Sequence, residues 1–178
     1  MVDRHKIFVS YHHSDENYRK KFDQMMNNDI VNCSVDLGDI DPDIKTEEIY
    51  RQIREYIKDA SVIVVLIGKD TWRRKFVDWE IYSALRQTQS SHRCGLLGIF
   101  LPTYGLNTDN TYNPRTVPPR LYSNVKKGQE FGELITWTEN SDWIKKKIDD
   151  AFKKRNAINP DLSDKLFKEN KSGAGWCW

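Results

Sequence analysis

Cysteine and long apolar runs are scarce in this chain. Its 178 residues include three cysteines, Cys33, Cys94 and Cys177, an odd number with no close pair. This spacing argues against a disulfide framework and against a zinc site. No apolar run approaches the roughly 20 residues of a membrane-spanning helix, and no signal peptide precedes the first predicted strand. We therefore expect a cytoplasmic protein.

Charge of one sign is not in excess either. Charged residues make up 30% of the chain and hydrophobic residues 38%, but the formal net charge is only +2. This balance gives no electrostatic reason to expect binding to nucleic acid or to a membrane surface. A chain of this length buries roughly 70% of its extended surface, which is enough for one domain with a real core.

Several motifs of common enzymes are also missing. The Gly68-Lys69 pair lacks the upstream glycine and the following Ser or Thr of a P-loop. No GxGxxG follows the first predicted strand, so a dinucleotide would not be held in the Rossmann manner. His12 and His13 have no companion at metal-ligand spacing, and neither HExxH nor GxSxG occurs. The sequence therefore predicts no metal site.

An alternation of apolar strands and amphipathic helices is what the sequence does contain. Short apolar runs predict strands at residues 6–11, 30–37, 61–67, 95–101 and 133–137. Capping residues and helical spacing predict helices that begin near residues 14, 46, 76 and 142. Such alternation is typical of an α/β fold with a parallel sheet. We expect a flavodoxin-like three-layer sandwich with five strands in the order 2-1-3-4-5.

The domain boundaries follow from the segments without periodicity. Residues 102–124 carry four of the six prolines and show no period, which indicates a surface insertion. The main domain is expected to span residues 1–156. Residues 157–178 would then form a C-terminal extension of unknown role. Its terminal tryptophans, Trp176 and Trp178, either pack back on the body or dock a partner.

Residues 70–81 are the most informative stretch, because they join a predicted buried strand to a helix. Ligands of open α/β sheets bind outside the carboxyl ends of the strands. The buried stripe of this helix consists of Val77, Ile81, Ala84 and Leu85. Glu80 falls at the edge of that stripe, where a carboxylate is partly desolvated, as in many enzyme sites. The alternative is a solvated glutamate that pairs with Arg73 or Arg74.

The sequence resembles a TIR domain at three places between residues 6 and 101. Residues 8–15, Phe-Val-Ser-Tyr-His-His-Ser-Asp, resemble the TIR opening (F/Y)-x-S-(Y/F)-x-x-x-D, and residues 36–44 lie where TIR domains carry their BB loop. Residues 76–80 fall on the TIR motif Trp-Cys-x-x-Glu, with the first two positions replaced and Glu80 kept. Residues 71–81 are similar to a string found in TIR-like proteins of the ThsB type, from bacterial Thoeris anti-phage defence.

This resemblance implies an activity on NAD. Enzymatic TIR domains cleave the nicotinamide–ribose bond, so NAD would be a substrate and not a redox cofactor. ThsB-type members would convert the remaining ADP-ribose into a cyclic signal that reaches a separate effector by diffusion, and TIR–TIR self-association is a further implied contact. Glu80 would be the catalytic carboxylate. The substrate-binding residues would be Phe8, Ser10, Tyr11, Asp36, Leu37, Trp72 and Trp79.

Two other interpretations stay open. A non-catalytic TIR-like adaptor would act through protein–protein contacts, and Glu80 would then be an ordinary residue of a helix face. A nucleoside deoxyribosyltransferase-like enzyme would share the architecture and would use the glutamate as a covalent nucleophile.

Overall fold

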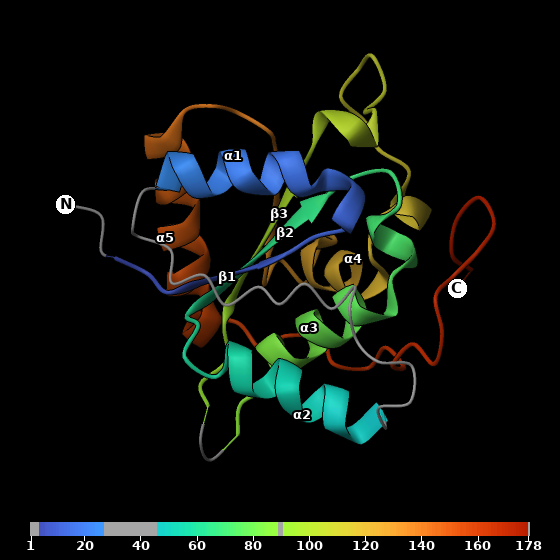
Figure 1. Cartoon of the computed structure of the whole chain (residues 1–178). Helices are drawn as coiled ribbons and strands as arrows, with labels where there is room; N and C mark the ends of the chain where they lie inside the picture. Colours follow the sequence, from blue (N-terminus) through green and yellow to red (C-terminus); the bar gives the residue numbers. More distant parts are fainter. Residues whose placement is uncertain (1–3, 27–45, 89–90, 178) are drawn as a thin grey trace.

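A parallel sheet forms the centre of the computed structural model, which describes residues 4–26, 46–88 and 91–177 (Figure 1). Its strands are β1 (Ile7–Ser10), β2 (Val62–Ile67), β3 (Gly95–Phe100) and β4 (Glu133–Thr136). They pair in the order β1-β2-β3-β4, and every pair is parallel. The predicted α/β fold with a parallel sheet is thereby confirmed, and it fits a flavodoxin-like arrangement. The strand predicted at residues 30–37 lies outside the described residues.

Four of the five helices of the described residues begin close to the predicted positions, and α4 was not predicted. The five helices are α1 (Glu16–Met26), α2 (Thr46–Ile57), α3 (Lys75–Leu85), α4 (Pro119–Val125) and α5 (Ser141–Ala157). Short 3-10 turns are η1 (His13–Asp15), η3 (Thr71–Arg73), η4 (Pro102–Tyr104) and η5 (Pro114–Thr116). Within the described ranges, no helix has both the length and the apolar character needed to cross a membrane.

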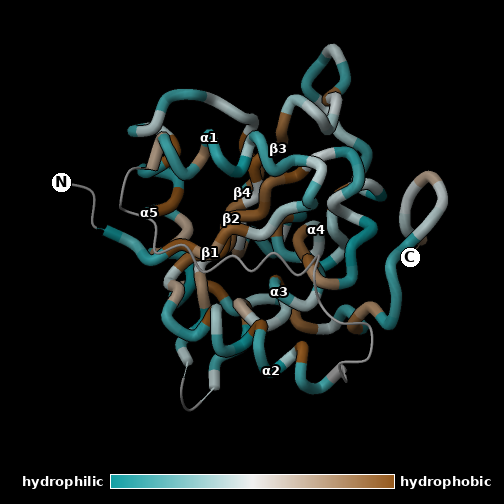
Figure 2. Tube along the Cα trace, in the orientation of Figure 1, coloured by the Kyte–Doolittle hydropathy of each residue, from teal (hydrophilic) through white to brown (hydrophobic). Residues whose placement is uncertain are grey.

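The sheet is covered on both faces. Helices α2, α3 and α4 lie on one face, and α1 and α5 lie on the other (Figure 1). Successive side chains of a strand point to opposite faces, so Ile63 and Val65 pack with α2 and α3 whereas Val64 packs with α1 and α5. This two-sided burial explains the unbroken apolar run of β2. Figure 2 shows the apolar strands enclosed by more polar helices.

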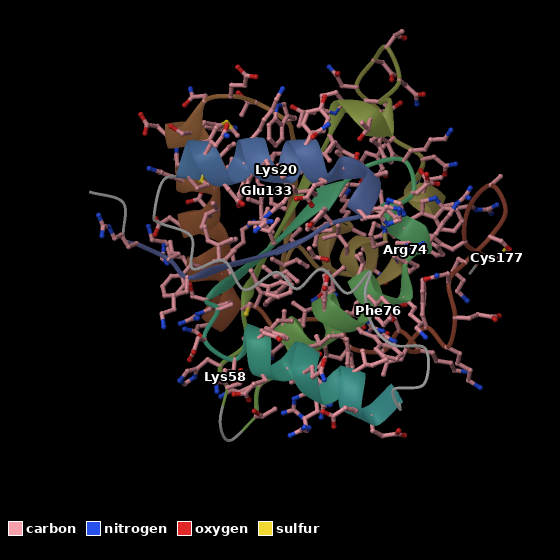
Figure 3. All side chains as sticks on the ribbon, in the orientation of Figure 1. Lys20, Lys58, Arg74, Phe76, Glu133 and Cys177 are labelled. Atoms are coloured by element: carbon pink, nitrogen blue, oxygen red, sulfur yellow. The ribbon has the colours of Figure 1, made fainter. Side chains whose placement is uncertain are left out.

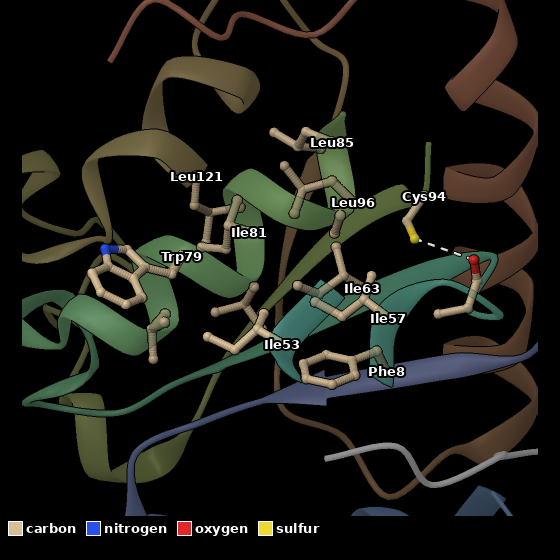
Figure 4. Packing of buried hydrophobic residues seen from close by; sticks show 14 of the residues in the cluster. Phe8, Ile53, Ile57, Ile63, Trp79, Ile81, Leu85, Cys94, Leu96 and Leu121 are labelled. Carbon is tan, nitrogen blue, oxygen red and sulfur yellow. Dashed lines mark hydrogen bonds between the residues drawn. The ribbon is translucent and has the colours of Figure 1, made fainter. Parts of the chain in front are cut away.

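The larger cluster of buried side chains lies between the sheet and α2 and α3 (Figure 4). Ile53 and Ile57 from α2 meet Phe8 and Ile63 from the sheet. Cys94, at the edge of this cluster, donates a hydrogen bond from its thiol to the carbonyl oxygen of Ala60 at 3.3 Å (Figure 4). Burial raises the pKa of the Cys94 thiol to about 12, so this cysteine is a packing residue.

Residues 102–124 differ from the surface insertion expected for them. They contain helix α4, and Val117 and Leu121 are completely buried against the larger cluster. The prolines that suggested a loop instead help to start the helix, because proline fits the first helical position, here Pro119.

Residues 158–177, here called the C-terminal arm, run without helix or strand along α4 and α3 (Figure 1). The main-chain N–H of Lys171 donates to the carbonyl oxygen of Arg73 at 2.7 Å. The indole N–H of Trp176 donates to the carbonyl oxygen of Val117 at 2.7 Å. Trp176 therefore packs back on the body, whereas Trp178 lies outside the described residues.

Gly95 brings β3 and α5 into close contact. A Cβ atom at this position would lie 2.3 Å from the carbonyl oxygen of Ala151, and a backbone atom cannot rotate away. We expect Gly95→Ala to destabilise the protein by about 1–3 kcal/mol through overpacking. Urea unfolding should show a lower midpoint, with exposed Lys146→Ala on α5 as a control of small effect. An unchanged midpoint for Gly95→Ala would contradict this close approach.

Candidate functional site

Glu80 lies on α3 and turns its side chain toward the end of β1. The hydroxyl of Ser10, the last residue of β1, donates a hydrogen bond to Oε2 of Glu80. Only 6% of Glu80 and 1% of Ser10 are exposed. Arg73, the alternative partner of a solvated Glu80, instead pairs with Asp70. Glu80 is therefore a buried residue whose carboxyl group is held by a strand end.

Burial governs the protonation of this carboxyl group. It raises the pKa of Glu80 from 4.5 to about 8, and the hydrogen bond from Ser10 opposes the rise. At pH 7 the carboxyl group is therefore mostly neutral. Carboxyl groups with strongly shifted pKa values are concentrated at functional sites.

The loop between β2 and α3 sets the position of Glu80. Thr71 is fully buried, and its hydroxyl accepts a hydrogen bond from the N–H of Gly68 at 2.9 Å and donates to the carbonyl oxygen of Leu66 at 3.3 Å. These bonds fasten the start of the loop to the end of β2. Two turns further on, Val77 and Ile81 pack into the larger cluster and fix the rotation of α3. Figure 3 labels Arg74 and Phe76 at the start of this helix.

Asp15 joins the ends of three strands beside this loop. Thr103, just after β3, donates a hydrogen bond to Oδ1 of Asp15 at 2.6 Å. Gly68 follows β2, and a Cβ atom there would lie 2.0 Å from Oδ2 of Asp15. Burial raises the pKa of Asp15, and the Thr103 hydrogen bond opposes it. In the sequence Asp15 only ends the stretch that resembles the TIR opening, and this contact could not be predicted because its partner is 88 residues away.

His12 lies at the same edge of the sheet. Burial, together with the charges of His13 and Arg74, lowers the pKa of His12 to about 4. Its Nδ1 atom accepts a hydrogen bond from the N–H of Ser14 at 3.1 Å. His12 is therefore neutral at pH 7. Among the described residues, no group of three or more His, Cys, Asp or Glu side chains is arranged to hold a metal.

Comparison with known protein families identifies the domain that carries these residues. A family described as "Thoeris protein ThsB, TIR-like domain" matches residues 8–104, which is more than half of the chain. The chain belongs to this family. It is thus a Thoeris-type defence protein, and the matched ThsB domain contains both Ser10 and Glu80. A search of curated proteins found no match.

In the ThsB-type domain, Ser10 lies next to Glu80, whereas the side chain of Tyr11 lies on the other face of the sheet. Because side chains alternate along a strand, Tyr11 faces the α1 and α5 side. There its hydroxyl donates to Glu16, and the guanidinium of Arg19 lies over its ring. Phe8 shares the face of Ser10 and is buried in the larger cluster.

The other predicted binding residues of the ThsB-type domain fall into two groups. Trp72 and Trp79 are both buried, and the indole N–H of Trp79 donates to the carbonyl oxygen of Phe167 at 2.9 Å. Packing within the chain therefore occupies both rings. Asp36 and Leu37 lie outside the described residues.

Proposed function

We propose that this ThsB-type protein cleaves the nicotinamide–ribose bond of NAD and closes the remaining ADP-ribose into a cyclic signal for a separate effector. The observation that carries the proposal is the buried carboxyl group of Glu80, held by Ser10 at the carboxyl end of β1. This is the edge of an α/β sheet where ligands bind. The proposal also rests on the family match, which spans both residues.

The chemistry requires little beyond one acidic side chain. Nicotinamide leaves as a neutral molecule, so the reaction needs no general acid. The transition state resembles an oxocarbenium ion, as in glycoside cleavage. A carboxylate that holds the ribose hydroxyls and lies near the developing positive charge lowers the barrier electrostatically.

A carboxyl group with a pKa of about 8 suits a cationic substrate. The nicotinamide ring of NAD carries a positive charge, and a nearby cation lowers the pKa of a carboxyl group. Binding of NAD would then ionise Glu80 as the substrate arrives. The new carboxylate would act in a buried setting, where electrostatic interactions are stronger than in water.

The other predicted site residues have proposed roles in positioning Glu80 and in controlling access to it. Ser10 positions Glu80 by its hydrogen bond. Asp36 and Leu37, which lead into the BB loop, are proposed to gate the site. Phe8, Trp72 and Trp79 are proposed to support the site by packing and not by touching the substrate, and Tyr11, on the other face of the sheet, has no proposed role in it.

The test is to incubate NAD with the purified protein and with extracts of cells that contain it, before and after phage challenge. Mass spectrometry should detect nicotinamide together with a product one water lighter than ADP-ribose, which marks cyclisation. ADP-ribose itself would indicate hydrolysis, and a glycosyl adduct on Glu80 would indicate a covalent nucleophile. Intact NAD in extracts of challenged cells would overturn the proposal in favour of an adaptor.

At NAD concentrations well below KM, the rate of cleavage should rise between about pH 7 and pH 9, because the rate then follows the ionisation of Glu80 in the free protein, where its pKa is about 8. Ser10→Ala removes a hydrogen bond that lowers this pKa, so the rise should move to higher pH. Initial rates of nicotinamide release from pH 6 to 9.5 check this. Ser61→Ala, at the opposite end of the sheet, should leave the profile unchanged. Identical profiles for Ser10→Ala and the parent protein would contradict the assignment.

A further inference from the structure

The C-terminal arm is hydrogen-bonded to one short stretch of the chain, from Arg73 to Trp79. Five hydrogen bonds join the two segments. The stretch closes the loop after β2 and forms the first turn of α3, immediately before Glu80. The family match ends at residue 104, so these bonds tie the helix of the candidate site to a segment outside the matched domain.

The arm supplies the cap that the first turn of α3 lacks. The first N–H groups of a helix have no partner within the helix itself. Arg74 occupies the N-cap position, and its side chain makes no capping hydrogen bond. Instead, the main-chain N–H of Lys75 donates to Oδ1 of Asn170, 95 positions away, at 3.0 Å. Asparagine is one of the preferred capping residues, so Asn170 stabilises this turn from the arm.

Phe167 holds the next part of the helix with both of its main-chain groups. Its N–H donates to Oδ2 of Asp78, and its carbonyl oxygen accepts from the indole N–H of Trp79, each at 2.9 Å. Asp78 is 2% exposed and Trp79 is 4% exposed, so both bonds are shielded from water. These two residues directly precede Glu80. Because the helix backbone is hydrogen-bonded from one turn to the next, a displacement of Asp78 and Trp79 would carry Glu80 with it.

The core holds the start of α3 less firmly than the turns that follow. Helix α3 has 11 residues, and a helix shorter than about 12 residues depends on tertiary contacts for its stability. From Val77 to Ile81 every residue is buried, whereas residues 73–76 are only partly buried. The hydrogen bonds of the arm therefore act where apolar packing around α3 is weakest.

We propose that the C-terminal arm is a positioning element of the candidate site, in which Phe167 and Asn170 hold the start of α3 so that Glu80 stays against Ser10. This inference rests on the proposed function, because it gives the arm a part in NAD cleavage. Both arm residues act through α3 and not through contact with NAD. A displacement of about 1 Å in an active site can lower a rate by about 100-fold, so a few hydrogen bonds at the start of this helix are enough to matter.

Asn170→Ala, with Asn170→Asp as the conservative variant, tests the proposal in the full chain. In Asn170→Ala, the single-turnover rate of nicotinamide release at saturating NAD should fall roughly fivefold, the equilibrium effect of one helix cap. The main-chain N–H of Glu80 should exchange with deuterium faster by a similar factor. Aspartate keeps the acceptor oxygen, so Asn170→Asp should restore both quantities. Exposed Lys168→Ala, from the same arm, is the matched control and should change neither.

An unchanged cleavage rate in Asn170→Ala would overturn the proposal, because the arm would then be a structural strap without effect on Glu80. A slower rate without faster exchange would also overturn it, since Asn170 would not act through α3. Equal losses in Asn170→Ala and Asn170→Asp would exclude the capping bond as the cause. If the parent protein leaves NAD intact, the proposed function fails by itself, and deuterium exchange at Glu80 alone decides whether the arm holds α3.

Discussion

Replacing Glu80 with glutamine should reduce nicotinamide release from NAD by roughly 100-fold or more. Glutamine keeps the shape of the side chain, and its carbonyl oxygen can still accept the hydrogen bond that Ser10 donates. It cannot carry the negative charge that faces the ribose in the transition state. Single-turnover assays with excess protein measure the rate of cleavage. Glu139→Gln, an exposed glutamate before α5, is the matched control and should leave the rate unchanged.

The stability of the same variant provides a second readout. The pKa of Glu80 rises from 4.5 in the unfolded chain to about 8 in the folded protein. The stability that neutral Glu80 contributes is complete below pH 4.5 and is lost as the pH rises through 8. The full shift corresponds to roughly 5 kcal/mol at alkaline pH, a cost that glutamine never incurs.

Thermal unfolding should therefore find Glu80→Gln more stable than the parent protein at pH 9, with a smaller difference at pH 6. A folded variant that still cleaves NAD at the parent rate would exclude Glu80 as the catalytic group. A variant with lower stability at pH 9 would contradict the burial of an ionisable carboxyl group here.

Arg120→Leu should destabilise the protein by about 3–5 kcal/mol, because it leaves a buried carboxylate without its cation. Arg120 is fully buried and Asp78 is 2% exposed. The guanidinium donates to Asp78 through Nε at 2.9 Å and through Nη2 at 3.4 Å. The N–H of Phe167 adds a third hydrogen bond to the same carboxylate. This network joins α3, α4 and the C-terminal arm.

Thermal unfolding should show a decrease of roughly 6–20 °C in Tm for this variant. Arg54→Leu, an exposed arginine on α2, is the matched control and should change the Tm little. The double variant Asp78→Leu with Arg120→Leu should recover much of the loss, since no unpaired charge remains. A single variant with the Tm of the parent protein would show that the pair is not buried as described.

The sequence was most informative where a pattern repeats. The unbroken Val and Ile run of β2 and the apolar stripe of α3 predicted elements that the structure confirms. Helix α4 was missed because its prolines are typical of loops, and only the burial of Leu121 reveals its place in the core. Local patterns predict local elements, but they do not tell which side of an irregular segment meets the core.

For the candidate site too, local patterns in the sequence indicated the residue but not its tertiary contacts. Glu80 stood out because an acidic residue at the border of an apolar stripe is unusual, but its hydrogen bond to Ser10 crosses 70 positions of the chain. Nothing near Trp79 in the sequence indicated that its indole would bind Phe167, 88 positions away. The arm has no periodic apolar residues, so the terminal tryptophans were the one sign of docking in the sequence, and they did not indicate α3 and α4 as the place.

The C-terminal arm is docked largely through its own backbone. Several of its hydrogen bonds to the body come from main-chain groups: the N–H and carbonyl of Phe167, the N–H groups of Lys171 and Trp176, and the carbonyl of Gly173. Every non-proline residue offers the same N–H and C=O groups. Most side chains of this segment can therefore be substituted without releasing the arm from α3 and α4. Related proteins can keep the same path of the backbone here although their sequences differ.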